Sequence, residues 1–234
     1  MKGKLYLIPT TLGDTAHERS FPSANNDLIR ALKHFVVEEL RTARRFLKKV
    51  DKAIDIDTLS IEVLNEHTDV KDVADMLRFI EKGEDIGLIS EAGCPAVADP
   101  GADIVAVAHR KGIQVVPLVG PSSILMSLMA SGFNGQNFAF VGYLPIKPNE
   151  KSKRIKQLES RVYAENQTQI FIEAPYRNNQ LMQTLVKQLA PHTRICVAAD
   201  ITLEQEFIQT KTAKEWKKSM PELHKRPTIF LIYK

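Results

Sequence analysis

The chain has 234 residues, of which 44% are hydrophobic, and a formal net charge of +4. This length suits one large or two small domains with a sizeable core, and the composition excludes an intrinsically disordered chain. The mildly basic charge permits an anionic partner such as RNA without requiring one. No apolar run approaches the ~20 residues of a membrane helix, and the first residues hold too short an apolar run for a signal peptide. The two cysteines indicate no disulfide framework, so we expect a cytoplasmic protein.

The first half of the chain alternates short apolar runs with segments of helical spacing. The apolar runs predict strands at residues 5–8, 35–37, 59–64, 86–89 and 113–117. Helices are expected between them, at residues 26–34, 41–49, 70–82 and 102–112. Asn26 or Asp27 is the expected cap of the first helix, and Asp69 is the expected cap of the third. This order predicts a parallel sheet with right-handed crossovers.

The second half of the chain mixes strand types. We expect strands at residues 138–141, 169–172, 194–198, 207–209 and 226–233. Helices are expected at residues 122–131, at 149–163, in a segment that ends at residue 189, and at 215–218. The segment 118–121 marks the seam between two α/β domains, which we place at residues 1–117 and 118–234. The fold class is therefore α/β, with a mostly parallel N-terminal sheet and a mixed C-terminal sheet.

A rigid loop follows the predicted strand at residues 86–89. It spans residues 90–101 and reads SEAGCPAVADPG, with two glycines and two prolines. The carboxyl ends of parallel strands are where open α/β sheets bind ligands. Three other features fall at such ends, namely the turn at 12–14, the pair Glu38-Glu39 and the segment 120–123. Together these positions predict a ligand site, but none of them forms a Rossmann fingerprint or a P-loop.

Several side chains allow two interpretations. Ser122 and Ser123 at a helix start can hold a carboxylate or simply cap the helix. Cys94 is either a nucleophile or a small loop residue, and no cysteine-enzyme signature surrounds it. The six histidines are scattered, so we expect no metal site.

Two groups of basic residues also stand out. The first group is Arg41, Arg44, Arg45, Lys48 and Lys49, and the second is Lys147, Lys151, Lys153, Arg154 and Lys156. The second group, a loop followed by a helix, can follow a phosphodiester backbone, and a solvated helix face is the alternative for either group.

Six segments form an ordered set of motifs along almost the whole chain. They are residues 5–14 (LYLIPTTLGD), 38–41 (EELR), 90–101, 116–122 (VPLVGPS), 142–147 (GYLPIK) and 173–177 (EAPYR). This set resembles the tetrapyrrole-methylase superfamily of S-adenosylmethionine-dependent methyltransferases. Within that superfamily, it is similar to the bacterial family that methylates ribose 2′-oxygens of small-subunit ribosomal RNA.

The resemblance implies two α/β domains, S-adenosylmethionine in the cleft between them, and a homodimer. The residues implied for the methionine part of the cofactor are Leu12, Ser90, Gly93, Cys94, Val97, Ser122 and Ser123. The residues implied for adenine and ribose are Phe171, Ala198, Ala199, Pro227 and Thr228. Adenine needs apolar walls with backbone hydrogen bonds, and these residue types suit that requirement.

The resemblance also directs attention to polar residues at the acceptor side. A sulfonium methyl group is already activated, so alignment is the main task, and a ribose hydroxyl benefits from a general base. The catalytic candidates are Glu38, Glu39, Arg41 and Glu173, among which the base is unassigned. The expected contacts to ribosomal RNA are Lys147, Lys151, Lys153, Arg154 and Arg177.

The sequence departs from the family pattern mainly at this acceptor side. Leu40 replaces a threonine, Leu64 stands where a histidine is usual, and the segment 198–203 lacks an arginine and a lysine. Two alternatives therefore stay open. One is a methyltransferase of a tetrapyrrole-like acid, and the other is a non-catalytic paralogue that binds RNA or cofactor.

Overall fold

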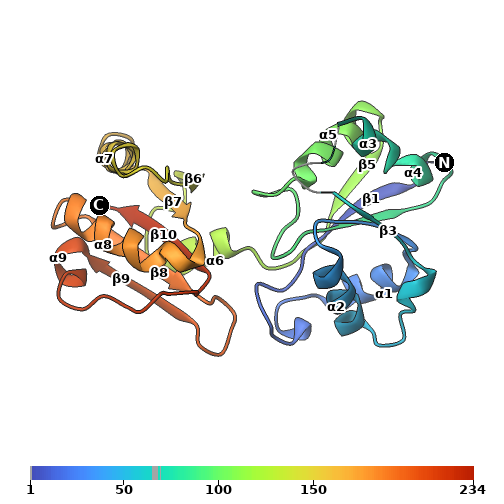
Figure 1. Cartoon of the computed structure of the whole chain (residues 1–234), viewed down its shortest axis with the longest axis horizontal. Coiled ribbons are helices and arrows are strands. Elements are labelled where there is room, and N and C mark those ends of the chain that lie inside the picture. The colour runs from blue at the N-terminus through green and yellow to red at the C-terminus, as the bar shows by residue number, and fades with distance from the viewer. Residues whose placement is uncertain (1, 65–67, 69) are drawn as a thin grey trace. The chain divides into compact units, whose positions relative to one another are not determined.

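The structure is a computed structural model that describes residues 2–64, 68 and 70–234 (Figure 1). The chain divides into two compact units, Met1–Ser122 and Ser123–Lys234. The boundary expected after residue 117 falls at the end of β5 (Gln114–Pro117), just before this division. Each unit is built on its own five-stranded sheet.

The N-terminal unit contains a parallel sheet, as predicted. Its other strands are β1 (Lys4–Ile8), β2 (His34–Val37), β3 (Ser60–Val63) and β4 (Ile86–Ile89). The strand order is β3-β2-β4-β1-β5, and every one of these neighbours pairs in parallel. Ile8 of β1 lies opposite Ile89 of β4, so the segments that follow these two residues leave the sheet side by side.

Helices cover both faces of this sheet (Figure 1). On one face, α1 (Ser23–Ala31) and α2 (Leu40–Val50) pack onto Ile8, Phe35 and Ile89. On the other face, α3 (Val70–Asp75), α4 (Arg78–Glu81) and α5 (Gly101–Arg110) share a core with strand residues of the opposite parity. Successive strand residues thus enter two different cores, as a doubly covered sheet requires.

The first predicted helix begins earlier than expected. Because α1 starts at Ser23, Asn26 and Asp27 lie inside it and do not cap it. The preceding Pro22 has extended backbone angles, and its ring fixes φ at a value suited to the start of a helix. The helix also ends before residue 34, because Leu32 is already extended.

The predicted helix at residues 70–82 is two shorter helices, α3 and α4. They are separated at Leu77, whose φ of −90° and ψ of 6° are not helical. This break leaves both Leu77 and Ile80 fully buried in the core. The expected cap, Asp69, lies outside the described residues.

The C-terminal unit contains a mixed sheet, also as predicted. Its strands are β6 (Phe138–Tyr143), β7 (Thr168–Ile172), β8 (Arg194–Ala199), β9 (Phe207–Thr212) and β10 (Thr228–Tyr233). The order is β6-β7-β10-β8-β9, in which β6 and β7 are parallel and the other pairs are antiparallel.

Four helices pack against this second sheet. The helices α7 (Pro148–Glu165), α8 (Asn178–Gln188) and α9 (Ala213–Trp216) share one core with the sheet. The helix α6 (Ser123–Ser131) packs against β9 and β10, where the Thr210 hydroxyl donates to the Ser131 carbonyl at 2.9 Å. Within the described part of the chain, no helix has the length and apolar character needed to cross a bilayer.

Candidate active site

Three loops meet at the carboxyl ends of β1, β4 and β5. The Thr10 amide donates to the Gly93 carbonyl at 2.9 Å, which joins the exit of β1 to the loop after β4. The Cys94 thiol donates to the Pro121 carbonyl at 3.4 Å, which joins that loop to the exit of β5. A Cβ atom on Gly93 would lie 3.2 Å from Leu12 Cδ2. The structure therefore brings together Leu12, Gly93 and Cys94, which the sequence had placed at one site.

The loop after β4 is held in an uncommon backbone conformation. Gly93, Ala96 and Ala98 have φ values of +74°, +65° and +61°. A positive φ is unfavourable for alanine, so the surroundings must enforce it. The Asp99 carboxylate does so by accepting hydrogen bonds from the Ala96 amide at 2.9 Å and the Gly101 amide at 2.7 Å. Such strain is typical of ligand-binding loops.

Two buried hydroxyls at this edge of the sheet lack a partner among the described residues. They are Thr10 Oγ1, after β1, and Ser90 Oγ, after β4. Buried polar atoms are nearly always hydrogen-bonded, so a bound polar ligand is the simplest partner for both. Ser90 was predicted from the sequence, but Thr10 was missed. The position of Thr10 just beyond a buried strand is the sequence feature that could have identified it.

Glu38 reaches the same edge from β2. Its amide donates to the Ile89 carbonyl at 3.2 Å, and its Oε2 accepts from the Glu91 amide at 3.2 Å. Burial raises the pKa of the Glu38 carboxyl, and the negative charges of Asp99 and Glu91 add to this effect against the Glu91 hydrogen bond. Glu38 lines a small crevice of about 10 Å³, with room for roughly one water molecule, together with Ser90, Pro95 and Asp99. It is a carboxyl group with a perturbed pKa in a concave site, which is a common feature of general acids and bases.

Glu39, next to Glu38 in the chain, is a helix cap. Its carboxylate accepts from the Arg41 amide at 2.9 Å and from the Thr42 amide at 2.6 Å, so it caps the start of α2. These hydrogen bonds hold the pKa of Glu39 below its ordinary value. Arg41 is exposed one residue into the helix. The two adjacent glutamates therefore differ: the pKa of Glu38 is raised, whereas Glu39 is a helix cap with a lowered pKa.

Cys94 does not fit the role of a nucleophile. Burial raises the pKa of its thiol, whereas reactive cysteines have a lowered pKa. The Cys94 side chain instead makes the hydrogen bond to the Pro121 carbonyl, in the segment that follows β5.

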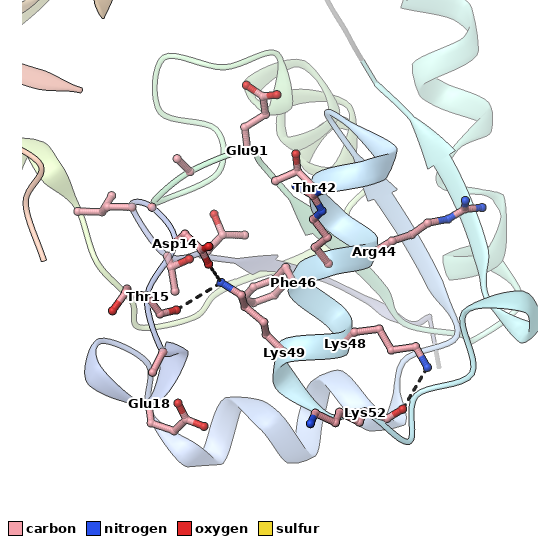
Figure 2. Close-up of a pocket in the computed structure, with 17 residues that line it drawn as sticks. Asp14, Thr15, Glu18, Thr42, Arg44, Phe46, Lys48, Lys49, Lys52 and Glu91 are labelled. Carbon is pink, nitrogen blue, oxygen red and sulfur yellow. Dashed lines mark hydrogen bonds and ion pairs between the residues drawn. The ribbon is translucent and has the colours of Figure 1, made fainter. Parts of the chain in front are cut away.

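All members of the first basic group except Arg41 line a pocket of about 1190 Å³ beside this edge (Figure 2). Its cationic lining residues are Arg44, Arg45, Lys48, Lys49 and Lys52, and its acidic ones are Asp14, Glu18 and Glu91. Figure 2 shows Lys49 pointing towards the Asp14 loop, with Nζ 2.5 Å from Asp14 Oδ1, while Arg44 extends from the other side of α2. The basic side chains of the first group are exposed on α2, and they give this concave surface a net positive charge.

In the C-terminal unit, Glu173 is the centre of a buried ion-pair cluster. Its side chain is 0% exposed and accepts from Lys151 Nζ at 2.8 Å, from Arg177 Nη2 at 2.7 Å and from the Ala174 amide at 2.9 Å. Burial alone raises its pKa, but the hydrogen bonds from Arg177, Lys151 and Ala174 outweigh burial and lower the pKa overall. A carboxylate with three such donors is a poor proton acceptor.

The same cluster divides the second basic group. Lys151 faces the interior of its unit, whereas Lys147 and Lys153 are exposed and Arg154 is half-buried. Of the residues expected to contact RNA, Lys151 is thus a buried ion-pair partner of Glu173. Lys151 lies on the side of α7 that packs against β7.

The residues expected around adenine come from β7, β8 and the start of β10. Phe171 is fully buried and stacks on Phe230 with ring centroids 6.1 Å apart. Ala198 and Ala199 are also buried in the core, and Thr228 lies opposite Ala199 in the sheet. Pro227, the residue before β10, is exposed. Near the expected methionine site, Val97 is exposed, and Ser122 and Ser123 are half-buried.

Known proteins match this chain in sequence over most of its length. The family described as Tetrapyrrole (Corrin/Porphyrin) Methylases matches residues 21–217. A relative from Bacillus subtilis, named "Ribosomal RNA small subunit methyltransferase I", is 31% identical over 208 residues, which are 88% of this chain and 67% of the relative. A relative of the same name from Halalkalibacterium halodurans is 33% identical over 212 residues, or 89% and 68% of the two chains.

Solved structures match the fold. A crystal structure of the methyltransferase CobJ has a TM-score of 0.66 and 15% identity, and it covers 99% of this chain and 94% of its own. A uroporphyrin-III C-methyltransferase from Thermus thermophilus, complexed with S-adenosylhomocysteine, has a TM-score of 0.59 and 16% identity, covering 99% and 98%.

The two α/β units and their strand-end loops define a methyltransferase of the two-unit α/β class. The chain belongs to the tetrapyrrole (corrin/porphyrin) methylase family. This confirms the resemblance carried by the six motifs, and with it the expected enzyme class.

Proposed function

We propose that the protein transfers a methyl group from S-adenosylmethionine to a ribose 2′-hydroxyl of small-subunit ribosomal RNA. The observation that carries this proposal is the match to relatives named for that RNA, at 31% and 33% identity over almost 90% of the chain. The rival acceptor, a tetrapyrrole acid, is supported by structures that are only 15% and 16% identical. Likeness at that level supports a shared fold rather than a shared substrate. The basic pocket on α2 also favours a polyanion.

The residues at the N-terminal strand ends fit the methionine part of the cofactor. The polar groups of that part would pair with the unpartnered hydroxyls of Thr10 and Ser90, and Gly93 gives backbone access. We propose that the other members of this set are Leu12, Cys94, Val97, Ser122 and Ser123. For adenine and ribose we retain Phe171, Ala198, Ala199, Pro227 and Thr228. Since the first three are buried side chains, their contacts would be made through the backbone. When bound, the cofactor supplies an activated methyl group.

Glu38 is the residue that we propose to accept the proton of the attacking hydroxyl. Among the four catalytic candidates, Glu39 caps a helix and Glu173 is held by cations, while the Arg41 guanidinium has no acceptor atom for a proton. Glu38 combines burial, a raised pKa and a place beside Ser90. The chain's other contribution is alignment of acceptor and methyl group.

Calorimetric titration with S-adenosylhomocysteine tests the proposal directly. We expect saturable binding to the purified protein. No heat of binding at ~1 mM ligand, which corresponds to an affinity weaker than about −4 kcal/mol, would contradict the assignment of the cofactor.

Replacing Gly93 by valine is expected to weaken S-adenosylhomocysteine binding by at least about tenfold. A β-branched residue at φ +74° is strained by about 1–3 kcal/mol, and its Cβ would press on Leu12. The matched control is Gly112→Val, since Gly112 has a φ of +63° with nothing within 4 Å of its Cβ position. This control keeps the backbone strain but not the loop contact. Equal affinities for the two variants would remove Gly93 from the cofactor site.

Charge reversal on α7 tests the RNA contact. The double variant Lys153→Glu/Arg154→Glu should bind ribosomal RNA more weakly and lower the slope of log K against log [salt] by at least about 1, because phosphate contacts release counterions. The control Lys217→Glu/Lys218→Glu reverses two exposed lysines elsewhere in the same unit. If both double variants have the wild-type slope, α7 does not contact the RNA backbone.

We further propose a cytoplasmic homodimer, because the ribosomal acceptor is cytoplasmic and the motif resemblance implies two copies. Sedimentation equilibrium tests the second point, and a monomer mass would contradict it. The family match supports an enzyme over the alternative of a non-catalytic paralogue. That alternative would bind S-adenosylhomocysteine without transferring a methyl group.

A further inference from the structure

Two exposed tyrosines lie at the exits of the parallel strands β6 and β7. Tyr143 ends β6 with 63% of its surface exposed, and Tyr176, in the 3₁₀ turn Pro175–Arg177, is 62% exposed. The pairing register places Tyr143 opposite Ile172, the last residue of β7. Both rings therefore come from the same end of adjacent strands. Grouped exposed apolar side chains indicate a binding surface, and Ile146, 70% exposed, adds to this group.

The backbone of β6 is shaped to direct Tyr143 outward. The pairing steps from Phe140–Ile170 to Tyr143–Ile172, so β6 carries one extra residue over this interval. Gly142 occupies this bulge with a φ of +67°. Bulges of this kind re-aim a side chain next to a functional site.

The Tyr176 ring is positioned by the ion-pair cluster beneath it. The Arg177 guanidinium carbon lies 4.9 Å from the ring centroid, and Arg177 Nη1 donates to the Tyr176 hydroxyl at 2.6 Å. Arg177 is itself fixed by Glu173. The exposed ring is therefore attached to a rigid support, so little side-chain freedom is lost when a ligand stacks on it.

Cations accompany the two rings. Arg177 lies against the Tyr176 ring, and the partly or fully exposed Lys147 and Arg154 belong to the segment that follows Tyr143. Lys151, between these two, is buried and paired with Glu173, so it offers no charge to a ligand. The nearby acids are neutralised in part, because Glu173 pairs with Lys151 and Arg177, and Glu150 lies 3.3 Å from Lys147. Exposed aromatic rings with flanking cations are the combination that binds single-stranded nucleic acid, by base stacking and phosphate attraction.

We propose that Tyr143 and Tyr176 form a stacking surface for unpaired bases of the RNA substrate. The inference rests on the proposed function and narrows it, because a duplex keeps its base faces inside the stack and cannot use this surface. The acceptor nucleotide accordingly lies in or next to an unpaired segment of the RNA.

Fluorescence anisotropy with a labelled single-stranded oligocytidylate of about ten nucleotides tests this surface. The variants Tyr143→Ala and Tyr176→Ala should each weaken binding about fivefold or more, since stacking on an aromatic ring contributes that much per base. Their salt slopes should equal that of the wild type, because no charge is removed. Tyr143→Phe and Tyr176→Phe keep the rings and should bind within about twofold of the wild type. Tyr163→Ala, at an exposed tyrosine of α7 that contacts Thr193, is the matched control and should leave binding unchanged.

Three results would overturn the inference. The first is wild-type affinity in both alanine variants, and the second is equal affinity of the wild type for the single strand and for a duplex of the same length. The third is a changed sedimentation mass in the alanine variants, which would make the surface a contact between copies. S-adenosylhomocysteine binding, measured on the same samples, separates this test from the proposed function. If the wild type does not bind S-adenosylhomocysteine, the methyltransferase proposal is contradicted. If it binds S-adenosylhomocysteine and the alanine variants keep the wild-type affinity for RNA, only the stacking surface is contradicted.

Discussion

Replacing Glu38 by glutamine is expected to lower kcat for methyl transfer to ribosomal RNA by about 10²–10⁴-fold, with little change in KM. Loss of a general base has an effect of this size, and glutamine keeps the shape of the side chain and its acceptor oxygen for the Glu91 amide. The acidic limb of the wild-type rate profile should follow the ionisation of Glu38. Because the pKa of Glu38 is raised, activity should rise with pH above the ordinary range of a glutamate.

Stability distinguishes this role from a structural one. A carboxyl whose pKa is raised by folding stabilises the folded state while it is protonated, and this contribution is lost as the pH rises through the folded pKa. Glutamine stays neutral, so Glu38→Gln should match or exceed the wild-type Tm at neutral pH. The control Glu39→Gln loses one of the two acceptor oxygens that cap α2, together with the negative charge, and should lower Tm while kcat is retained. Wild-type kcat in Glu38→Gln would exclude Glu38 as the base.

The second large effect is expected in the stability of the C-terminal unit. Glu173→Gln should lower the free energy of unfolding by about 3–5 kcal/mol, because it leaves Lys151 buried without its counter-ion. The protein's single tryptophan, Trp216, is buried in this unit, so its fluorescence reports the relevant transition in denaturant. The variant Glu204→Gln, at an exposed carboxylate of the same unit, is the control and should change little.

A second substitution and the pH dependence test whether the unpaired Lys151 causes this loss of stability. The double variant Glu173→Gln/Lys151→Met removes the unpaired cation and should recover most of the lost stability. The pKa of Glu173 is below its ordinary value of 4.5, so its contribution is present above that value and is lost as the pH falls through the folded pKa. Glu173→Gln should lack this acid-dependent part. A double variant less stable than Glu173→Gln would contradict the ion-pair explanation.

The sequence was most informative where one periodicity dominates. Buried parallel strands such as Ile86–Ile89 are continuous apolar runs, and their carboxyl ends necessarily share one edge of the sheet. The meeting of Leu12, Gly93 and Cys94 could therefore be predicted before any coordinate was known. The identity of the ligand came from the ordered motifs rather than from periodicity.

Neighbouring residues of the same type were harder to separate. Glu38 and Glu39 differ only in which one turns back to cap α2 and which one enters the sheet edge, and tertiary hydrogen bonds decide this. Lys151 looks like its exposed neighbours in sequence, yet it lies on the side of α7 that packs onto β7. The bulge at Gly142 also has no local sequence signal beyond a glycine in a strand.

The most direct test of the account is methyl transfer from S-adenosylmethionine with a labelled methyl group. The acceptors are the small ribosomal subunit, its naked RNA and a uroporphyrin-type acid, offered in parallel. We expect label in RNA from one or both ribosomal acceptors, recovered after nuclease digestion as a single 2′-O-methylated nucleoside by mass spectrometry. Label on the tetrapyrrole, or no transfer to any acceptor by protein that binds S-adenosylhomocysteine, would contradict it.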